Sequence, residues 1–205
     1  MAALGREQLR AAVLRYVELP GARFLRALGL TPNAVTLLGF GLTVAGACLV
    51  ALGWLVAGGV VFLVGGGLDL LDGALARLNG TASPFGALLD SVFDRLGEAS
   101  LFVGLAVYAL RAGFSPGYLL FFMLTLLLAL IFSQGVSYLR ARGEGLGVFS
   151  KAGLMTRPER VVLLGLGLMV QQIEWVLVLI AVVSCFTLFQ RMFTIRGELE
   201  RGGPK

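Results

Sequence analysis

Long apolar stretches without charged residues are the feature of this sequence that most restricts its fold. One of them, from Ala34 to Val64, contains no Asp, Glu, Lys or Arg. About 20 apolar residues are enough for a helix to cross the hydrocarbon core of a bilayer. Of the 205 residues, 58% are hydrophobic and only 14% are charged, whereas soluble domains carry about 25% charged residues. The sequence therefore predicts a membrane protein.

The apolar stretches are long enough for about six spanning helices, so the sequence predicts an all-α, polytopic membrane protein. We expect the spans at Pro32–Leu55, Val56–Leu78, Phe85–Leu110, Pro116–Leu139, Pro158–Val170 with a few flanking residues, and Glu174–Phe193. Thr31 and Pro32 are typical of a helix start, because a hydroxyl can cap the first turn and proline needs no N–H there. The spans define a transmembrane domain at residues 31–195 and a cytoplasmic tail at residues 196–205.

Residues 1–30 are predicted to form a juxtamembrane amphipathic helix. The stretch from Arg6 to Leu28 mixes arginines with Leu, Val, Tyr and Phe. This mixture is typical of a helix that lies on a membrane surface with its apolar side in the lipid.

The basic residues are distributed unevenly between the two sides of the predicted membrane. Of the 17 Lys and Arg residues, only Arg111 falls in a connection on the side opposite to the rest. Basic residues favour the cytoplasmic side, so we expect both termini and the active site to be cytoplasmic, in the plasma membrane of a prokaryote. The net charge of +5 reflects this topology. Without a soluble basic domain it does not indicate nucleic-acid binding.

The residue types present limit the possible chemistry. The chain contains no histidine, which excludes a histidine base or metal ligand, so acid–base catalysis must use carboxylates, Lys, Tyr or Cys. The two cysteines, Cys48 and Cys185, both lie in apolar stretches. We interpret them as small packing residues.

All four aspartates of the chain lie between Asp69 and Asp94. Asp69 and Asp72 are three residues apart, and Asp90 and Asp94 are four apart, so each pair shares one face of a helix. The segment Asn79–Pro84 is typical of a turn that folds two helices into antiparallel neighbours. The four carboxylates would then converge, and hard divalent cations such as Mg²⁺ suit carboxylate oxygens. Two such ions could clamp the attacking and leaving oxygens of a phosphoryl transfer.

Other interpretations of the four aspartates are open. Arg77 and Arg95 could neutralise them in salt bridges, although two arginines do not balance four carboxylates in a low dielectric. Intramembrane acids also line ion pathways, so a divalent-cation transporter is the non-enzyme alternative. A structural scaffold is a weaker alternative, because it has no need of aspartates in the membrane.

The residues around the aspartates carry a known pattern. Asp69, Asp72, Gly73, Ala76, Arg77, Gly86, Asp90 and Asp94 match D-x2-D-G-x2-A-R-x8-G-x3-D-x3-D at every fixed position. In this pattern the chain resembles the CDP-alcohol phosphotransferases, and the six-span layout extends the resemblance over nearly the whole chain. The resemblance implies a membrane enzyme that transfers a lipid phosphate from a CDP-linked lipid, such as CDP-diacylglycerol, to an alcohol and releases CMP.

The resemblance also implies a role for individual residues. Asp69, Asp72 and Asp90 would bind metal, while Asp94 would contact the second metal and act as general base. The CDP-lipid would be bound by Asn33, Ala34, Val35, Thr36, Asp69, Gly73, Ala76, Arg77, Ser83 and Gly86. Within that set, Gly73 and Ala76 lack bulk beside the nucleotide, and Arg77 can neutralise the pyrophosphate. Two Mg²⁺ or Mn²⁺ ions per active site and a homodimer are further implications.

A second group of basic residues indicates an anionic acceptor. It consists of Arg140, Arg142, Arg157, Arg160 and Arg191, which we expect at the depth of the aspartates. Arginine binds phosphate bidentately, although basic residues at cytoplasmic helix ends also follow from topology alone. Ser133–Arg142 and Arg157–Arg160 resemble segments of the actinobacterial-type phosphatidylinositol phosphate synthases, which implies inositol 1-phosphate as acceptor. Phosphatidylglycerophosphate synthesis from glycerol 3-phosphate is the alternative, because that acceptor is also anionic.

Overall fold

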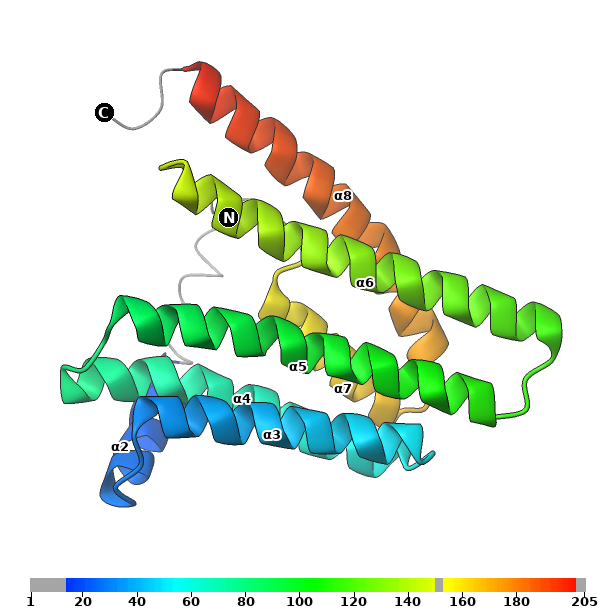
Figure 1. Cartoon of the computed structure of the whole chain (residues 1–205), viewed down its shortest axis with the longest axis horizontal. Coiled ribbons are helices and arrows are strands. Elements are labelled where there is room, and N and C mark those ends of the chain that lie inside the picture. The colour runs from blue at the N-terminus through cyan, green and yellow to red at the C-terminus, as the bar shows by residue number, and fades with distance from the viewer. Residues whose placement is uncertain (1–13, 150–152, 202–205) are drawn as a thin grey trace. The chain divides into compact units, whose positions relative to one another are not determined.

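The structure, a computed structural model, describes residues 14–149 and 153–201 of the chain. In chain order the elements are η1 (Leu14–Glu18), α2 (Leu19–Ala27), α3 (Pro32–Ala51), α4 (Leu55–Asn79), α5 (Pro84–Arg111), α6 (Pro116–Gly145), α7 (Arg157–Met169) and α8 (Ile173–Glu200) (Figure 1). The described residues contain no strand, so the predicted all-α class is confirmed. Residues 1–13 of the predicted amphipathic helix and residues 202–205 of the predicted tail lie outside the described residues.

Four of these helices, α3, α4, α6 and α8, are long and apolar enough to cross a membrane. Helix α5 has 28 residues, but charged side chains between Asp90 and Glu98 interrupt its apolar sequence. Helix α7 has only 13 residues, so at 1.5 Å per residue it is roughly 20 Å long. The chain therefore has the helices of a multi-pass membrane protein, while the number of about six spans stays a prediction.

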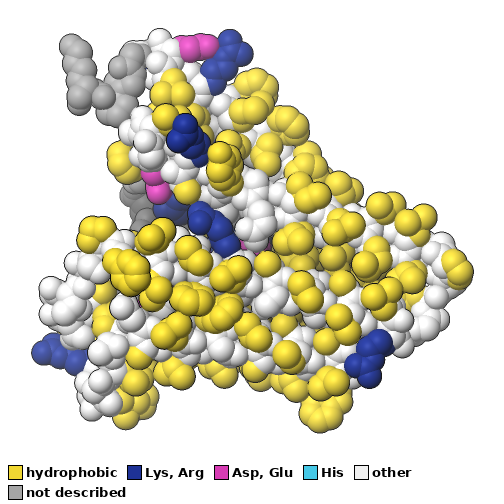
Figure 2. Space-filling view, viewed as in Figure 1, with side chains coloured by type: hydrophobic (Ala, Val, Ile, Leu, Met, Phe, Trp, Pro, Cys, Tyr) yellow, Lys and Arg dark blue, Asp and Glu magenta, His cyan; other side chains and the backbone are white. Residues whose placement is uncertain are grey.

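Apolar side chains cover the outer surface of the long helices. Leu124 of α6 and Phe186 of α8 are among the large apolar residues that are exposed, and Figure 2 shows hydrophobic side chains over much of the visible face. A soluble protein rarely exposes apolar patches of this extent. Such a surface suits contact with lipid.

The helices divide into two compact units. Unit 1 comprises residues 14–45 and 61–98, and thus α2, most of α3 and α4, and the first half of α5. Unit 2 comprises residues 46–60 and 99–201, and thus the other ends of these three long helices together with α6, α7 and α8. All the predicted metal and CDP-lipid residues lie in unit 1, and the five predicted acceptor arginines lie in unit 2.

Close packing in unit 1 fixes helix α4 against two neighbours. A Cβ atom on Gly65 of α4 would lie 2.8 Å from the carbonyl oxygen of Gly39 of α3, so only glycine permits this approach of the two helices. Helix α4 also packs against α2 in a core that contains Ala22, Leu25, Val35, Ala74 and Leu75. The stretch of α4 with Asp69 and Asp72 is therefore held in place by its neighbours.

In unit 2, α6 and α8 pack side by side and run parallel. Gly135 faces Leu188, and about two turns later Gly143 faces Ile195, so both helices advance in the same direction. The buried residues recur at spacings of three and four on both helices, at Phe122, Leu126, Ala129, Ser133 and Val136 of α6 and at Ile173, Leu177, Ile180, Ser184, Thr187 and Arg191 of α8. Arg191 is the last residue of this series, so an arginine lies in the buried contact between α6 and α8, the α6–α8 seam.

Candidate active site

Three aspartates come together in unit 1. One carboxylate oxygen from each of Asp69, Asp72 and Asp90 lies within 4.8 Å of the others. Asp69 and Asp72 share a face of α4, and Asp90 comes from the adjacent start of α5. Three carboxylate oxygens at this separation suit a hard divalent cation, which would polarise phosphate oxygens when bound. The assignment of these side chains as metal ligands stays a prediction, and their geometry fits it.

Asp94 lies one turn beyond Asp90 on α5 and outside this group of three. Its Oδ1 atom is buried. One helical turn separates the Cβ atoms of such a pair by about 5–6 Å. Asp94 is thus beside the carboxylate cluster without being part of it. The sequence predicts that four carboxylates converge, and the group of oxygens within 4.8 Å of one another contains three. The roles of Asp94 as metal ligand and general base stay predictions.

A buried threonine holds one of the three carboxylates. The hydroxyl of Thr36 on α3 donates a hydrogen bond to Oδ2 of Asp72 over 2.5 Å. Thr36 is 4% exposed and Asp72 is 5% exposed, so water does not compete for the contact. The same hydroxyl lies 3.2 Å from the carbonyl oxygen of Pro32, a longer contact. The sequence predicts Thr36 as a CDP-lipid residue, and the structure places it where it orients a carboxylate of the cluster.

We expect the substitution Thr36→Val to weaken Mn²⁺ binding about tenfold, because partners that orient a metal ligand typically contribute 10–100-fold in affinity. Valine has nearly the shape of threonine and removes only the hydroxyl. The measurement is a Mn²⁺ titration followed by electron paramagnetic resonance. Thr43→Val is the matched control, since Thr43 is also buried in α3 but donates to the carbonyl of Phe40. An equal loss in both variants would contradict a specific role for Thr36.

Capping interactions define the turn between the two aspartate pairs. After α4 ends, Gly80 adopts a left-handed conformation with φ of 66°, and the N–H groups of Gly80 and Thr81 donate to the carbonyls of Arg77 and Ala76. This pair of bonds is a Schellman motif, which needs glycine at that position. Ser83 then caps α5, because its Oγ accepts the N–H of Gly86 over 3.1 Å. The turn lies where the sequence predicts it.

Three of the predicted CDP-lipid residues meet beside this turn. A Cβ atom on Gly86 would lie 3.2 Å from Ser83 Oγ and 3.7 Å from Asn33 Oδ1. Asn33 lies in the first turn of α3 and offers a side-chain amide there. Val35, by contrast, is 1% exposed and belongs to the core of unit 1, so its side chain faces inward. The structure thus separates the predicted set into polar residues at the turn and a residue of the core.

The guanidinium of Arg77 lies over the adjacent turn of α4. Its Nη1 atom would be 3.4 Å from a Cβ atom on Gly73, and its Nη2 atom is 3.2 Å from Oε2 of Glu18. Arg77 thus forms an ion pair with Glu18, and the alternative that arginines neutralise the aspartates stays untested. No signal in the sequence singles out Glu18 as the partner, because 59 residues separate the two.

Two of the predicted acceptor arginines converge on one turn of α6 in unit 2. Arg160 of α7 is 0% exposed, and its Nη2 donates to Oγ of Ser137 over 3.2 Å. Arg191 of α8 is 4% exposed, and its Nη1 donates to the carbonyl of Val136 over 2.8 Å. Burying a cation is costly unless it is compensated. The charge of Arg160 acts on Arg191, and the carboxylates of Glu144 and Glu159 offset part of the charge of Arg191.

The other three acceptor candidates differ from this pair. Arg140 and Arg142 at the end of α6 are exposed, and Arg140 forms an ion pair with Glu144 of 2.9 Å. Arg157 is partly buried at the start of α7, a helix whose first turn is capped by Thr156 and Glu159. Gly153 packs against the guanidinium of Arg191 and is a residue of this region that the sequence analysis missed.

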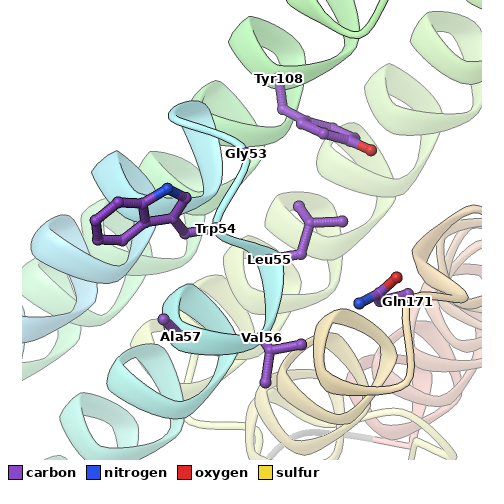
Figure 3. Close-up of a pocket in the computed structure, with 7 residues that line it drawn as sticks. All are labelled: Gly53, Trp54, Leu55, Val56, Ala57, Tyr108 and Gln171. Carbon is purple, nitrogen blue, oxygen red and sulfur yellow. The ribbon is translucent and has the colours of Figure 1, made fainter.

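A pocket in unit 2 contains none of the predicted site residues. It has a volume of about 450 Å³ and lies at the connection between α3 and α4, lined by Gly53, Trp54, Leu55, Val56, Ala57, Tyr108 and Gln171 (Figure 3). In Figure 3 the side chains of Tyr108 and Gln171 lie on one side of the connection, and that of Trp54 lies on the other. It has no carboxylate and no arginine, so we do not assign the chemistry to it.

A carboxylate cluster at the turn of two apolar helices, with an arginine and small residues beside it, defines a class of membrane enzyme that handles phosphate with metal ions. A sequence profile of the CDP-alcohol phosphatidyltransferases matches residues 29–190, and the chain belongs to this family. It is therefore a phosphatidyltransferase. Membership favours an enzyme over the cation-transporter and scaffold alternatives.

Two relatives are similar to this chain over most of its length. The chain is 35% identical over 196 residues to the archaetidylinositol phosphate synthase of Pyrococcus horikoshii, which covers 95% of this chain and 98% of that protein. It is 39% identical over 199 residues to the phosphatidylinositol phosphate synthase of Mycolicibacterium smegmatis, covering 88% and 85% of the two chains.

Solved structures agree with these relatives. The crystal structure of Mycobacterium tuberculosis phosphatidylinositol phosphate synthase with CDP-DAG bound has a TM-score of 0.77 and 34% identity, and the match covers 87% of this chain and 93% of that one. The same enzyme in complex with manganese and citrate also has a TM-score of 0.77 and 34% identity, covering 87% of this chain and 88% of that one.

Proposed function

We propose that this enzyme transfers the phosphatidyl group of CDP-diacylglycerol to inositol 1-phosphate, giving phosphatidylinositol phosphate and CMP. The donor half of the proposal is supported by the membership in the family and by the relative that binds CDP-DAG. The acceptor half is supported by relatives that make inositol phosphate lipids.

The observation that carries the acceptor is the buried pair Arg160 and Arg191 on the Val136–Ser137 turn of α6. The planar guanidinium fork matches a phosphate group and is more weakly hydrated than an ammonium, so arginine suits a buried phosphate site. A phosphorylated acceptor would bring a negative charge to both guanidiniums, which a neutral alcohol would not. The pair therefore favours a phosphorylated polyol over a neutral alcohol such as free inositol.

The residues of unit 1 supply the donor half of the reaction. Arg77 offers its guanidinium to the pyrophosphate, and Gly73 leaves room for the nucleotide against the α4 backbone. Asn33 and Ser83 bind polar groups of the cytidine or its phosphate. A divalent metal at the aspartate cluster would neutralise phosphate charge as it develops, and we infer two such ions, Mg²⁺ or Mn²⁺, at Asp69, Asp72, Asp90 and Asp94.

Asp94 acts as general base in this scheme. Its carboxylate takes the proton of the acceptor hydroxyl while the hydroxyl oxygen bonds to the phosphorus of the phosphatidyl group. The bond from that phosphorus to the oxygen of the CMP phosphate breaks, and CMP leaves with the electron pair. We also infer that the enzyme is a homodimer in a prokaryotic plasma membrane, with both termini and the active site in the cytoplasm.

The decisive experiment measures CMP release from CDP-diacylglycerol with Mg²⁺ in the presence of inositol 1-phosphate, glycerol 3-phosphate or free inositol. We expect release with inositol 1-phosphate at a rate at least about 100-fold above that with free inositol, since a site built to pair a charged group rejects an analogue that leaves it unpaired. Glycerol 3-phosphate carries the same phosphate, so its rate decides between the two anionic acceptors. Release with glycerol 3-phosphate alone would show that glycerol 3-phosphate is the acceptor, and CDP-diacylglycerol would remain the donor. Release with none of the three would contradict the proposal.

A further inference from the structure

One contact in unit 1 has no place in the reaction scheme so far: the ion pair between Glu18 and Arg77. Oε2 of Glu18 lies 3.2 Å from Nη2 of Arg77. The side chain of Glu18 is 14% exposed and that of Arg77 is 62% exposed. The carboxylate is thus largely enclosed, while the guanidinium that it contacts faces outward and can still receive a ligand.

Packing of α2 against α4 brings Glu18 to Arg77. Glu18 is the residue before α2, at the position of its N-cap, yet its side chain makes no capping hydrogen bond. The following residues dock firmly, because a Cβ atom on Gly21 would lie 2.8 Å from Leu71 of α4. Ala22 and Leu25 of α2 are buried in the same core as Ala74 of α4. The carboxylate is therefore directed to Arg77 rather than to the N-terminus of its own helix.

The contact leaves most of the guanidinium available. An arginine has five N–H groups in a rigid planar fork, and Glu18 contacts it through Nη2. Nη1 points back over Gly73, the residue without bulk that the proposed function places against the nucleotide. An exposed ion pair contributes little to stability. The ion pair therefore matters less for stability than for the orientation of the Arg77 guanidinium.

We propose that Glu18 is a positioning residue for donor binding, which holds the guanidinium of Arg77 over Gly73 in the orientation that receives the pyrophosphate of the CDP-lipid. The inference rests on the proposed function, in which Arg77 binds that pyrophosphate. A helix outside the transmembrane domain thereby supplies a residue to the donor site. Because a long exposed side chain samples many rotamers, fixing it in advance lowers the cost of binding.

The test compares Glu18→Ala and Glu18→Gln with the unmodified enzyme, each with Arg77 and with Arg77→Ala. We expect Glu18→Ala to raise the KM for CDP-diacylglycerol about fivefold, the scale of an exposed ion pair, with kcat and the KM for the acceptor unchanged within twofold. Glu18→Gln keeps a hydrogen-bond acceptor and should recover part of the loss. In the Arg77→Ala background, Glu18→Ala should have no further effect. Glu200→Ala is the control, because Glu200 forms an exposed ion pair of 2.7 Å with Arg196 far along the chain.

Several outcomes would overturn the inference. An unchanged KM for the donor in Glu18→Ala would show that Arg77 needs no support, and a lower KM would show that Glu18 competes with the donor instead. A fivefold rise that persists in the Arg77→Ala background would show that Glu18 acts through the fold, which a thermal melt of the detergent-solubilised variants would reveal. If the unmodified enzyme releases no CMP from CDP-diacylglycerol with any acceptor, the proposed function itself fails, and this inference with it.

Discussion

Replacing Asp94 by asparagine is expected to lower the rate of CMP release by about 10³-fold, within the range of 10²–10⁴ that a general base contributes. The amide has the size and shape of the carboxylate but cannot take the proton of the acceptor hydroxyl. Asp94 lies outside the group formed by Asp69, Asp72 and Asp90, so three carboxylates remain for metal. CDP-diacylglycerol binding, measured by calorimetry with Mn²⁺, should therefore change by less than about threefold.

The matched control for this prediction is Glu98→Gln on the same helix. Glu98 lies one turn beyond Asp94 and is 2% exposed, so the control also neutralises a buried acid of α5. We expect it to keep most of the activity. An equal loss in both variants would mean that the charge of α5 matters, not a base at position 94. Near-normal turnover in Asp94→Asn would exclude Asp94 as the base, and lost donor binding would make it a binding group instead.

The starts of the helices could be predicted from the sequence, and so could the ends of α4, α5 and α7 to within one residue, but the ends of α6 and α8 could not. Pro32 and Pro116 begin α3 and α6 as expected, because proline is preorganised for the first turn of a helix. The span predicted to end at Leu139 continues as helix to Gly145, and the one predicted to end at Phe193 continues to Glu200. The apolar pattern ends where a bilayer would end, whereas residues such as Arg, Glu and Leu continue a helix readily.

The carboxylate cluster could be foreseen because its residues lie within one helical hairpin. Spacings of three and four residues determine which side chains share a face, and the turn at Gly80 determines how the two faces meet. The contacts of Thr36 with Asp72 and of Glu18 with Arg77 join residues 36 and 59 positions apart. No local pattern encodes such pairs, since they depend on how α2 and α3 pack against α4.

The burial of the predicted acceptor arginines also could not be predicted from local sequence patterns. From the sequence, topology alone is a serious explanation for Arg157 and Arg191 among the five arginines. The structure instead buries Arg160 and Arg191 while it leaves Arg140 and Arg142 exposed. The distinction arises from the three-and-four spacing of buried residues on α8, which ends at Arg191. That spacing is visible in the sequence only once α6 is known to be the partner of α8.

The buried pair Arg160 and Arg191 gives the second prediction with a large expected effect, on the KM for the acceptor. We expect Arg191→Lys to raise the KM for inositol 1-phosphate about 30-fold, which corresponds to roughly 2 kcal/mol for a hydrogen bond to a charged group. Lysine keeps the positive charge but cannot form a bidentate contact with phosphate. The KM for CDP-diacylglycerol should stay within twofold, because the donor residues lie on α3, α4 and α5. Steady-state kinetics with each substrate varied in turn would measure both constants.

Arg196→Lys is the control for this substitution, because Arg196 lies on the same helix but is exposed in an ion pair with Glu200. Inorganic phosphate adds a readout that a loss of folding does not produce. It should compete with inositol 1-phosphate in the unmodified enzyme, and its inhibition constant should rise in Arg191→Lys by the same factor as the KM. Because both ligands share only the phosphate, parallel changes would locate that group at Arg191. A KM that rises without any change in phosphate inhibition would place the phosphate elsewhere and leave Arg191 as a residue of the α6–α8 seam.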